Sequence, residues 1–219
     1  MDDMNLIDRL IVQLDTLIPF ISISYKDVFD LIQKEKDIWF QENSKGTLPK
    51  TYEIFRTQVT HSAFLLGYSY FEVFLGELIR KIYLSNHKML PKEKQLKFSE
   101  IIEASTYEDV IEMMIEKETL SIFYQSFEKI VEYYQTKLEL TWPVEHKNQV
   151  LVASLLRNCI IHNMSRVDIR LARNSEYEIG QEIQLSSSEV HSYGIHVRAL
   201  SRELYRQANE RYFNKNKGA

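Results

Sequence analysis

The chain has 219 residues, of which 44% are hydrophobic and 26% are charged, and this balance excludes an intrinsically disordered protein. At this length we expect one or at most two domains with a substantial buried core. The net charge of −4 argues against a general nucleic-acid coat, but residues 141–219 carry 11 Lys+Arg against 8 Asp+Glu. A nucleic-acid site is therefore expected in the C-terminal third, if the chain has one.

In the first half of the chain, apolar residues recur at the spacing of an α-helix. Leucines recur over residues 5–17, and Pro19 is expected to end or kink that helix before a second one over residues 21–40. The longest periodic segment, residues 51–84, predicts a central helix with a broad apolar surface.

Capping signals mark helices in the second half. Residues 106–109 (Thr-Tyr-Glu-Asp) resemble a capping box that opens a helix of about ten residues. An aromatic-rich helix is predicted over residues 120–138 and a strong one over residues 145–163. Residues 186–189 (Ser-Ser-Ser-Glu) form a capping box for a closing helix that extends to about Phe213.

This pattern predicts an all-α protein, an up-and-down bundle of four core helices with short accessory helices. We expect residues 1–50 to form an N-terminal helical extension packed on the bundle, either as a separate cap or as part of it. Residues 51–213 form the main helical domain, and residues 214–219 form a disordered tail.

Cys159 is the single cysteine, so an internal disulfide is excluded, and its apolar surroundings indicate a small buried side chain. The N terminus is acidic and lacks a secretory segment, and we find no apolar run long enough to cross a bilayer. We therefore expect a cytoplasmic protein that has no association with a membrane.

The helix predicted over residues 145–163 carries polar side chains where its apolar spacing calls for leucine. Its stripe of leucines continues at the same spacing with Asn158 and His162. Arg157 lies one step round the helix and is long enough to fold back toward His162. A buried group of Arg, Asn and His is costly unless it is satisfied by partners or has a role.

This segment, Arg157-Asn158-Cys-Ile-Ile-His162 followed by Asn163, resembles the motif of the HEPN superfamily. Ribonuclease members of that family carry Arg and, a few residues later, His, often with a polar residue directly after the Arg. The loose spacing alone is not specific, because Arg56 and His61 also satisfy it, as do Arg80 and His87. The Asn after Arg157 distinguishes the motif, and we expect His61 to be structural or exposed.

Two flanking regions are also similar to HEPN proteins: the helix over residues 68–79, and residues 180–183 leading into the serine-rich cap of the closing helix. The resemblance covers about residues 60–212 and implies a HEPN-like bundle. It implies a metal-independent endoribonuclease that acts as a homodimer, with two motifs facing each other across a basic cleft. A bacterial toxin or phage-defence effector is the usual setting of the family.

The chemistry of RNA cleavage is coherent with these side chains. Attack of a 2′-hydroxyl on the adjacent phosphate needs no metal, only a proton acceptor or donor and a cation that stabilises the phosphorane. His162 suits the first role and Arg157 the second, while Asn158 either orients the histidine or hydrogen-bonds the phosphate. We expect 2′,3′-cyclic phosphate and 5′-hydroxyl products, no cofactor and no metal site.

Other residues are candidates for supporting roles. Candidates for contacts with the RNA backbone are three arginines at helical spacing on the closing helix and three just after the motif (Arg198, Arg202 and Arg206; Arg166, Arg170 and Arg173). The alternative is a solvated face paired with Glu203 or Glu210. Asn163 is a further supporting candidate. Glu72 either hydrogen-bonds Arg157 or His162, or has a surface or capping role.

The sequence thus favours an endoribonuclease acting on tRNA or mRNA, controlled by a cognate antitoxin or a nucleotidyltransferase-type partner. The first alternative is a non-catalytic HEPN-like module that binds RNA, a nucleotide or a protein partner. The second is a helical dimerisation protein with no role in nucleic-acid chemistry. A motif buried far from any cleft would favour the last.

Overall fold

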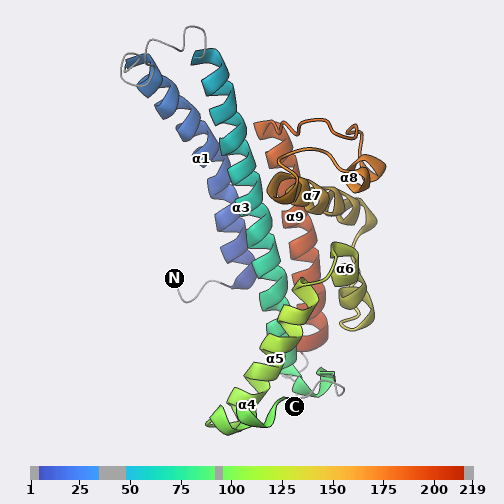
Figure 1. The fold of residues 1–219 in the computed structure, drawn as a ribbon. Helices are drawn as coiled ribbons and strands as arrows, with labels where there is room; N and C mark the ends of the chain where they lie inside the picture. Colours follow the sequence, from blue (N-terminus) through green and yellow to red (C-terminus); the bar gives the residue numbers. More distant parts are fainter. Residues whose placement is uncertain (1–4, 35–47, 92–95, 215–219) are drawn as a thin grey trace. The chain divides into compact units, whose positions relative to one another are not determined.

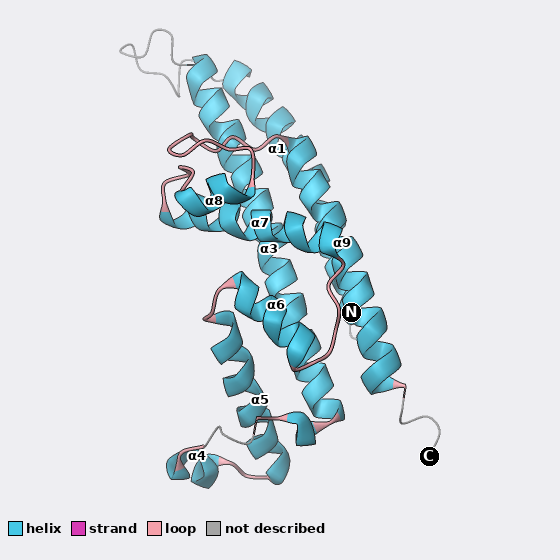
Figure 2. Ribbon diagram, turned by 90° about the vertical axis from the view of Figure 1, so that its right-hand side faces the viewer, coloured by secondary structure: helices cyan, strands magenta, loops and turns pink. Residues whose placement is uncertain are grey.

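The computed structural model describes residues 5–34, 48–91 and 96–214, and every regular element within them is a helix (Figures 1 and 2). In these residues, strand-type pairing is limited to one isolated antiparallel bridge between Arg166 and Glu182. The chain is therefore all-α, as the helical spacing predicts. Apart from Asn214, the tail expected at residues 214–219 lies outside the described residues.

The chain forms two compact units that alternate along the sequence. The first comprises Met1–Ile7, Glu72–Lys147 and Ala199–Ala219, and the second comprises Asp8–Phe71 and Asn148–Arg198. Four long helices contribute residues to both units: α1 (Leu6–Lys34), α3 (Leu48–Ser85), α7 (Val144–His162) and α9 (Ser187–Ala208). The division expected after residue 50 falls inside α3.

The first unit has its core around Trp142. Its shorter elements are η1 (His87–Met89), α4 (Phe98–Glu103), α5 (Tyr107–Phe123), α6 (Phe127–Thr136) and the π-helical turn η2 (Asn209–Phe213). The Trp142 ring lies edge-on to Phe127 and Tyr134, with centroids 5.6 and 5.5 Å apart. The Tyr134 hydroxyl donates a 2.6 Å hydrogen bond to the Leu75 carbonyl, which ties α6 to α3 inside this unit.

A buried carboxylate lies in the same unit. Glu118 on α5 is only 3% exposed, and it accepts a 2.8 Å hydrogen bond from the hydroxyl of Tyr133. The Tyr133 hydroxyl also contacts the hydroxyl of Tyr83. Burial is the main reason why the pKa of Tyr83 is raised to about 12. The network therefore joins α3, α5 and α6 through polar groups inside an otherwise apolar core.

The second unit is built from the rest of the long helices. Here α1, α3 and α9 lie side by side, and α7 crosses them (Figures 1 and 2). The helices approach closely where side chains are small: a Cβ added at Gly67 would lie 2.9 Å from the side chain of Leu17. Phe64 and Tyr193 pack edge-on, with centroids 5.6 Å apart. The up-and-down bundle of four core helices stays a prediction.

Pro19 does not end the first helix, which corrects the prediction of two separate helices. It is an exposed residue inside α1, which continues to Lys34. The proline removes one backbone hydrogen bond, but Leu17 and Ile21 on either side of it are both buried. Burial of this continuous apolar stripe offsets the loss and keeps the helix intact.

Both predicted capping boxes are confirmed. The amide of Asp109 donates to the Thr106 hydroxyl (3.1 Å), and the Thr106 amide donates to the Asp109 carboxylate (2.9 Å). Ser186 and Glu189 make the same reciprocal pair at 3.2 and 2.8 Å at the start of α9. Each box satisfies amides that a helix leaves without a partner in its first turn.

The prediction of one helix over residues 120–138 is wrong. The chain breaks between α5 and α6, where Ser126 adopts an extended conformation as the N-cap of α6. Two short helices, α4 and α8 (Ile169–Asn174), were not predicted, because six residues are too few to show a helical period.

Part of α3, Glu53–Ser85, is long and apolar enough to cross a membrane by length and composition alone, contrary to our expectation that no such run exists. Half of its most apolar window is buried inside the protein, as in the core helix of many soluble proteins. The test is one of length and composition only, so expectations about membranes and location in the cell stay predictions.

We predict that Glu118→Leu lowers the free energy of unfolding by about 1–3 kcal/mol, because it removes the carboxylate acceptor of the Tyr133 hydroxyl inside the core. Glu118→Gln keeps an acceptor oxygen and should cost less. Urea denaturation followed by circular dichroism measures both. Glu116→Leu, an exposed position on the same helix, should change stability by no more than about 0.5 kcal/mol. Equal effects of the two leucine variants would contradict a role for this network.

Candidate functional site at the end of α7

Arg157 and Asn158 lie at the edge of the buried face of α7, and His162 lies at the end of the helix. That face consists of Val150, Ala153, Ser154, Leu155, Leu156 and Cys159. Arg157 and Asn158 are half-buried, and His162 is exposed as the last residue of the helix. The helix predicted over residues 145–163 is confirmed as α7, but Arg157, Asn158 and His162 are not enclosed in the core. The imidazole is therefore accessible to solvent.

Arg157 and Asn158 contact each other directly. The guanidinium of Arg157 donates a 3.1 Å hydrogen bond through Nη1 to Oδ1 of Asn158. The guanidinium is planar, and its donors have the geometry that suits phosphate oxygens. His162 lies five residues after Arg157, about 7.5 Å along the axis and about 140° round it, but four residues after Asn158, about 6 Å along the axis and about 40° round it. The hydrogen bond from Arg157 shows that Asn158 orients the arginine.

A hydrogen-bonded turn ends the helix immediately after His162. The carbonyl of Cys159 accepts from the amides of both Asn163 (3.0 Å) and Ser165 (3.1 Å). Met164 and Ser165 have φ angles of 49° and 59°, a left-handed conformation that is unusual for residues other than glycine. The Asn163 side chain donates a 2.7 Å bond to the Arg166 carbonyl, so this residue closes the turn.

The segment after the turn is held by backbone pairing. The Val167 amide donates to the Gln181 carbonyl at 2.9 Å, and the Gly180 amide donates back to the Val167 carbonyl at 2.9 Å. Gly180 has a φ of +79°, which its lack of a side chain permits. Asp168 caps α8 by accepting a 2.8 Å bond from the Leu171 amide. This frame exposes the three post-motif arginines: Arg166, Arg170 and Arg173.

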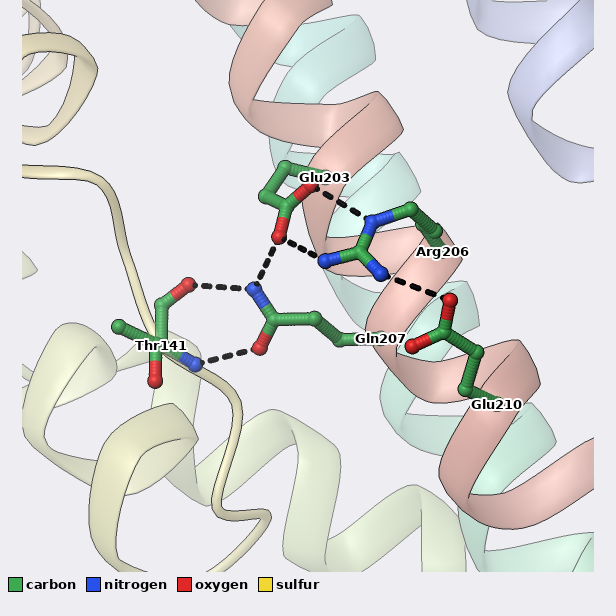
Figure 3. Close-up of polar contacts among 5 residues, drawn as sticks. All are labelled: Thr141, Glu203, Arg206, Gln207 and Glu210. Atoms are coloured by element: carbon green, nitrogen blue, oxygen red, sulfur yellow. Dashed lines mark hydrogen bonds and ion pairs between the residues drawn. The ribbon is translucent and has the colours of Figure 1, made fainter.

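Two arginines of the predicted stripe on α9 are engaged by carboxylates. In the second unit, Arg198 forms an ion pair with Asp15. In the first unit, Arg206 bonds both Glu203 and Glu210 (Figure 3). The bonds from Arg206 are the main reason why the pKa of the Glu203 carboxyl is lowered. For Arg206 the structure matches the paired, solvated face that we considered as the alternative.

Gln207 belongs to the same group in the first unit. Its amide accepts a 2.7 Å bond from the backbone N–H of Thr141 and donates a 3.0 Å bond to the Thr141 carbonyl (Figure 3). It also donates to Glu203. This end of α9 therefore anchors the segment that precedes α7. Arg202, the remaining member of the stripe, is exposed.

His61, which lies far from the motif in sequence, contacts the turn that follows it. The residue is 5% exposed on α3, and its Nδ1 lies 3.5 Å from the hydroxyl of Ser165. Burial lowers the pKa of the imidazole, whereas the backbone of Ile183 and the charge of Glu182 act in the opposite direction. His61 and His162 share the same spacing from an arginine but have opposite environments, one buried and one exposed.

The remaining features to place are Glu72, a groove in the second unit and metal ligands. Glu72 is half-buried on α3 and belongs to the first unit, so its predicted contact with Arg157 or His162 stays a prediction. A groove of about 400 Å³ in the second unit is lined by other residues, among them Tyr25, Arg56 and Ser186. Among the described residues, no group of three or more His, Cys, Asp or Glu side chains is arranged to hold a metal ion.

Comparisons with known proteins assign no family. No family model matches the chain, and we found no significant match among curated proteins or solved structures.

We predict that His61 makes stability depend on pH. Because its pKa is lower in the folded state than in the unfolded chain, its full contribution is present above pH 6.5 and is lost as the pH falls below that value. Between pH 7.5 and 5.0, His61→Asn should reduce the slope of unfolding free energy against pH by at most about 1.4 kcal/mol per pH unit.

Urea denaturation across this pH range measures the slope. His191→Asn, at an exposed position on α9, is the matched control and should leave it unchanged. The same slope in the wild type and in His61→Asn would mean that burial does not shift the His61 pKa.

Proposed function

We propose that this chain is a metal-independent endoribonuclease of the HEPN type, with its chemistry at the end of α7. The observation that carries the proposal is the exposure of His162 on the last residue of the helix, with Arg157 preceding it and oriented by Asn158. An imidazole that a substrate can reach can act as a general acid or base, and an oriented guanidinium can bind two phosphate oxygens.

In the proposed reaction, the ribose 2′-oxygen attacks the adjacent phosphorus, and the bond from phosphorus to the 5′-oxygen breaks. The 2′-hydroxyl loses its proton and the departing 5′-oxygen gains one, and His162 serves one of these transfers. Arg157 stabilises the negative charge that grows on the non-bridging oxygens. The products are a 2′,3′-cyclic phosphate and a 5′-hydroxyl.

The post-motif arginines are the better candidates for binding the RNA backbone. Arg166, Arg170 and Arg173 are exposed on the segment that begins directly after His162. Arg166 already bonds the Gly180 carbonyl, whereas Arg198 and Arg206 have carboxylate partners, which neutralise more of their charge. Binding of phosphate by those two would first require their ion pairs to break, which reduces the gain in free energy.

We propose that a second copy of the chain completes the site. Large apolar side chains are exposed around the motif end (Ile161, Met164, Ile169 and Ile179). Residues 157–182 also hold four arginines and four carboxylates, so the segment has no net charge from these groups. A segment with no net charge is not repelled as a whole by a second copy of itself about a two-fold axis.

The proposed biological role follows from the resemblance to HEPN proteins alone. We propose a cytoplasmic toxin or phage-defence effector that acts on tRNA or mRNA and is restrained by an antitoxin or a nucleotidyltransferase-type partner. One observation favours a non-catalytic binding module instead: Arg157 and Asn158 satisfy each other in part, as a structural pair would. Such a module would bind RNA without cleaving it.

We predict that the purified protein cleaves RNA in the presence of EDTA. His162→Ala should reduce the rate by about 10²–10⁴-fold and Arg157→Ala by about 10²–10³-fold. Gel assays give the rates, and enzymatic mapping of the product ends tests for the 2′,3′-cyclic phosphate. His191→Ala, another exposed histidine, should retain full activity.

The proposal is wrong if both motif variants leave cleavage and growth toxicity unchanged. RNA binding without turnover by the wild type would favour the binding module.

We predict that Met164→Glu converts a dimer into a monomer. Met164 is 91% exposed, so a charge there should leave the folded chain intact but disrupt an apolar interface. Analytical ultracentrifugation measures the mass. Tyr124→Glu, at a position 88% exposed in the first unit, is the control and should leave the dimer intact. A monomeric wild type at micromolar concentrations would contradict this part of the proposal.

A further inference from the structure

The turn that follows His162 needs support from outside itself. Met164 and Ser165 are consecutive non-glycine residues with φ angles of 49° and 59°. Such residues each cost about 1 kcal/mol or more, and they persist only where the surroundings impose the conformation. The two bonds to the Cys159 carbonyl come from the turn and its own helix. The Asn163 side chain and the Arg166 amide add bonds within the turn, and contacts with neighbouring elements add to them.

Ser165 is the residue through which that support reaches the turn. Its amide donates to the Cys159 carbonyl on α7 at 3.1 Å, and its carbonyl accepts from the Ile183 amide at 2.7 Å. Its hydroxyl lies 3.5 Å from Nδ1 of His61 on α3. Three polar groups of one residue thus contact three separate parts of the second unit.

His61 is well placed for this task. It lies on the buried stripe of α3 with Phe64 and Tyr68, and the helix there is held by apolar packing. A neutral imidazole has one nitrogen that donates and one that accepts, and a hydroxyl can take either role, so Nδ1 of His61 can pair with the Ser165 hydroxyl in either tautomer. At 3.5 Å the contact is longer than an ordinary hydrogen bond, so it adds little to the free energy of unfolding, and the inference concerns only how the two side chains limit each other's position.

We propose that His61 is a positioning residue: through Ser165 it holds the turn after α7 and thereby sets the direction of the His162 imidazole. This inference rests on the proposed function for its catalytic consequence, but its structural part stands alone. His162 is the exposed last residue of α7 and the turn begins directly after it, so the direction in which its side chain leaves the backbone follows the end of the helix. His61 itself is buried and does not touch RNA.

The test uses the full chain and four variants. His61→Leu and Ser165→Ala each remove one side of the contact. His61→Asn keeps a polar group near the position of Nδ1 and is the conservative variant. Thr60→Val is the matched control, because Thr60 is also buried on α3 but its hydroxyl bonds the carbonyls of Arg56 and Thr57 on its own helix.

The first readout is the imidazole spectrum of His162 by nitrogen-15 NMR, assigned by the loss of its signals in His162→Asn. We expect His61→Leu and Ser165→Ala to move the His162 signals and their titration midpoint in the same direction. His61→Asn should restore them, and Thr60→Val should leave them in place. The second readout is cleavage, where kcat should fall about 10- to 100-fold in the first two variants, with little change in KM.

Each outcome has a distinct meaning. Unmoved His162 signals in folded His61→Leu and Ser165→Ala overturn the inference, whether or not the wild type cleaves RNA. Moved signals in a protein that cleaves no RNA support the positioning and contradict the proposed function. If His61→Leu does not fold, Ser165→Ala alone decides, because it removes the hydroxyl without altering the buried face of α3.

Discussion

The Cys159 carbonyl accepts backbone hydrogen bonds from Asn163 and Ser165, and the arrangement of the candidate site depends on these two bonds. It ends α7 at His162 and reverses the chain through two left-handed residues. The reversal brings residues 165–167 alongside residues 180–183, where backbone bonds hold them. A helix that continued for one more turn would place Asn163 and Arg166 on its surface and leave no turn for Ser165 to anchor.

In the C-terminal third, the number of Lys and Arg residues overstates the positive charge that the surface offers to a ligand. The excess of Lys and Arg there predicts a basic surface, but Arg198, Arg206 and Arg211 each form an ion pair with a carboxylate of the chain. Exposed pairs of this kind add little to stability, yet they reduce the positive charge offered to a ligand. The post-motif arginines are exposed and follow His162 directly in the chain, so they stay the candidates for contact with an anionic partner.

Local signals in the sequence predict much of the fold. Both capping boxes and the extents of α3, α7 and α9 follow from residue type and spacing, because their bonds join residues close together in the chain. The continuity of α1 through Pro19 does not follow, since it depends on burial of Leu17 and Ile21 against other helices. Short α8 also escapes prediction, because it owes its start to one cap at Asp168.

The candidate site was predictable in part for the same reason. Arg157, Asn158 and His162 lie within two turns of one helix and show as a local pattern. The contact of His61 with Ser165 joins residues 104 positions apart. One signal was available: His61 falls on the stripe formed by Phe64, Tyr68 and Phe71, all of them buried. A histidine on such a stripe is expected to have a polar partner, but only the folded chain identifies it.

The central claim is that the end of α7 cleaves RNA through the ribose 2′-hydroxyl. The most direct measurement uses two synthetic RNAs that differ only in a 2′-deoxy sugar on the 5′ side of the mapped cleavage bond. The account predicts that the unmodified bond is cut and that the modified bond is not, while other bonds in the same molecule are cut as before. Cleavage of the modified bond at the same rate would contradict the account.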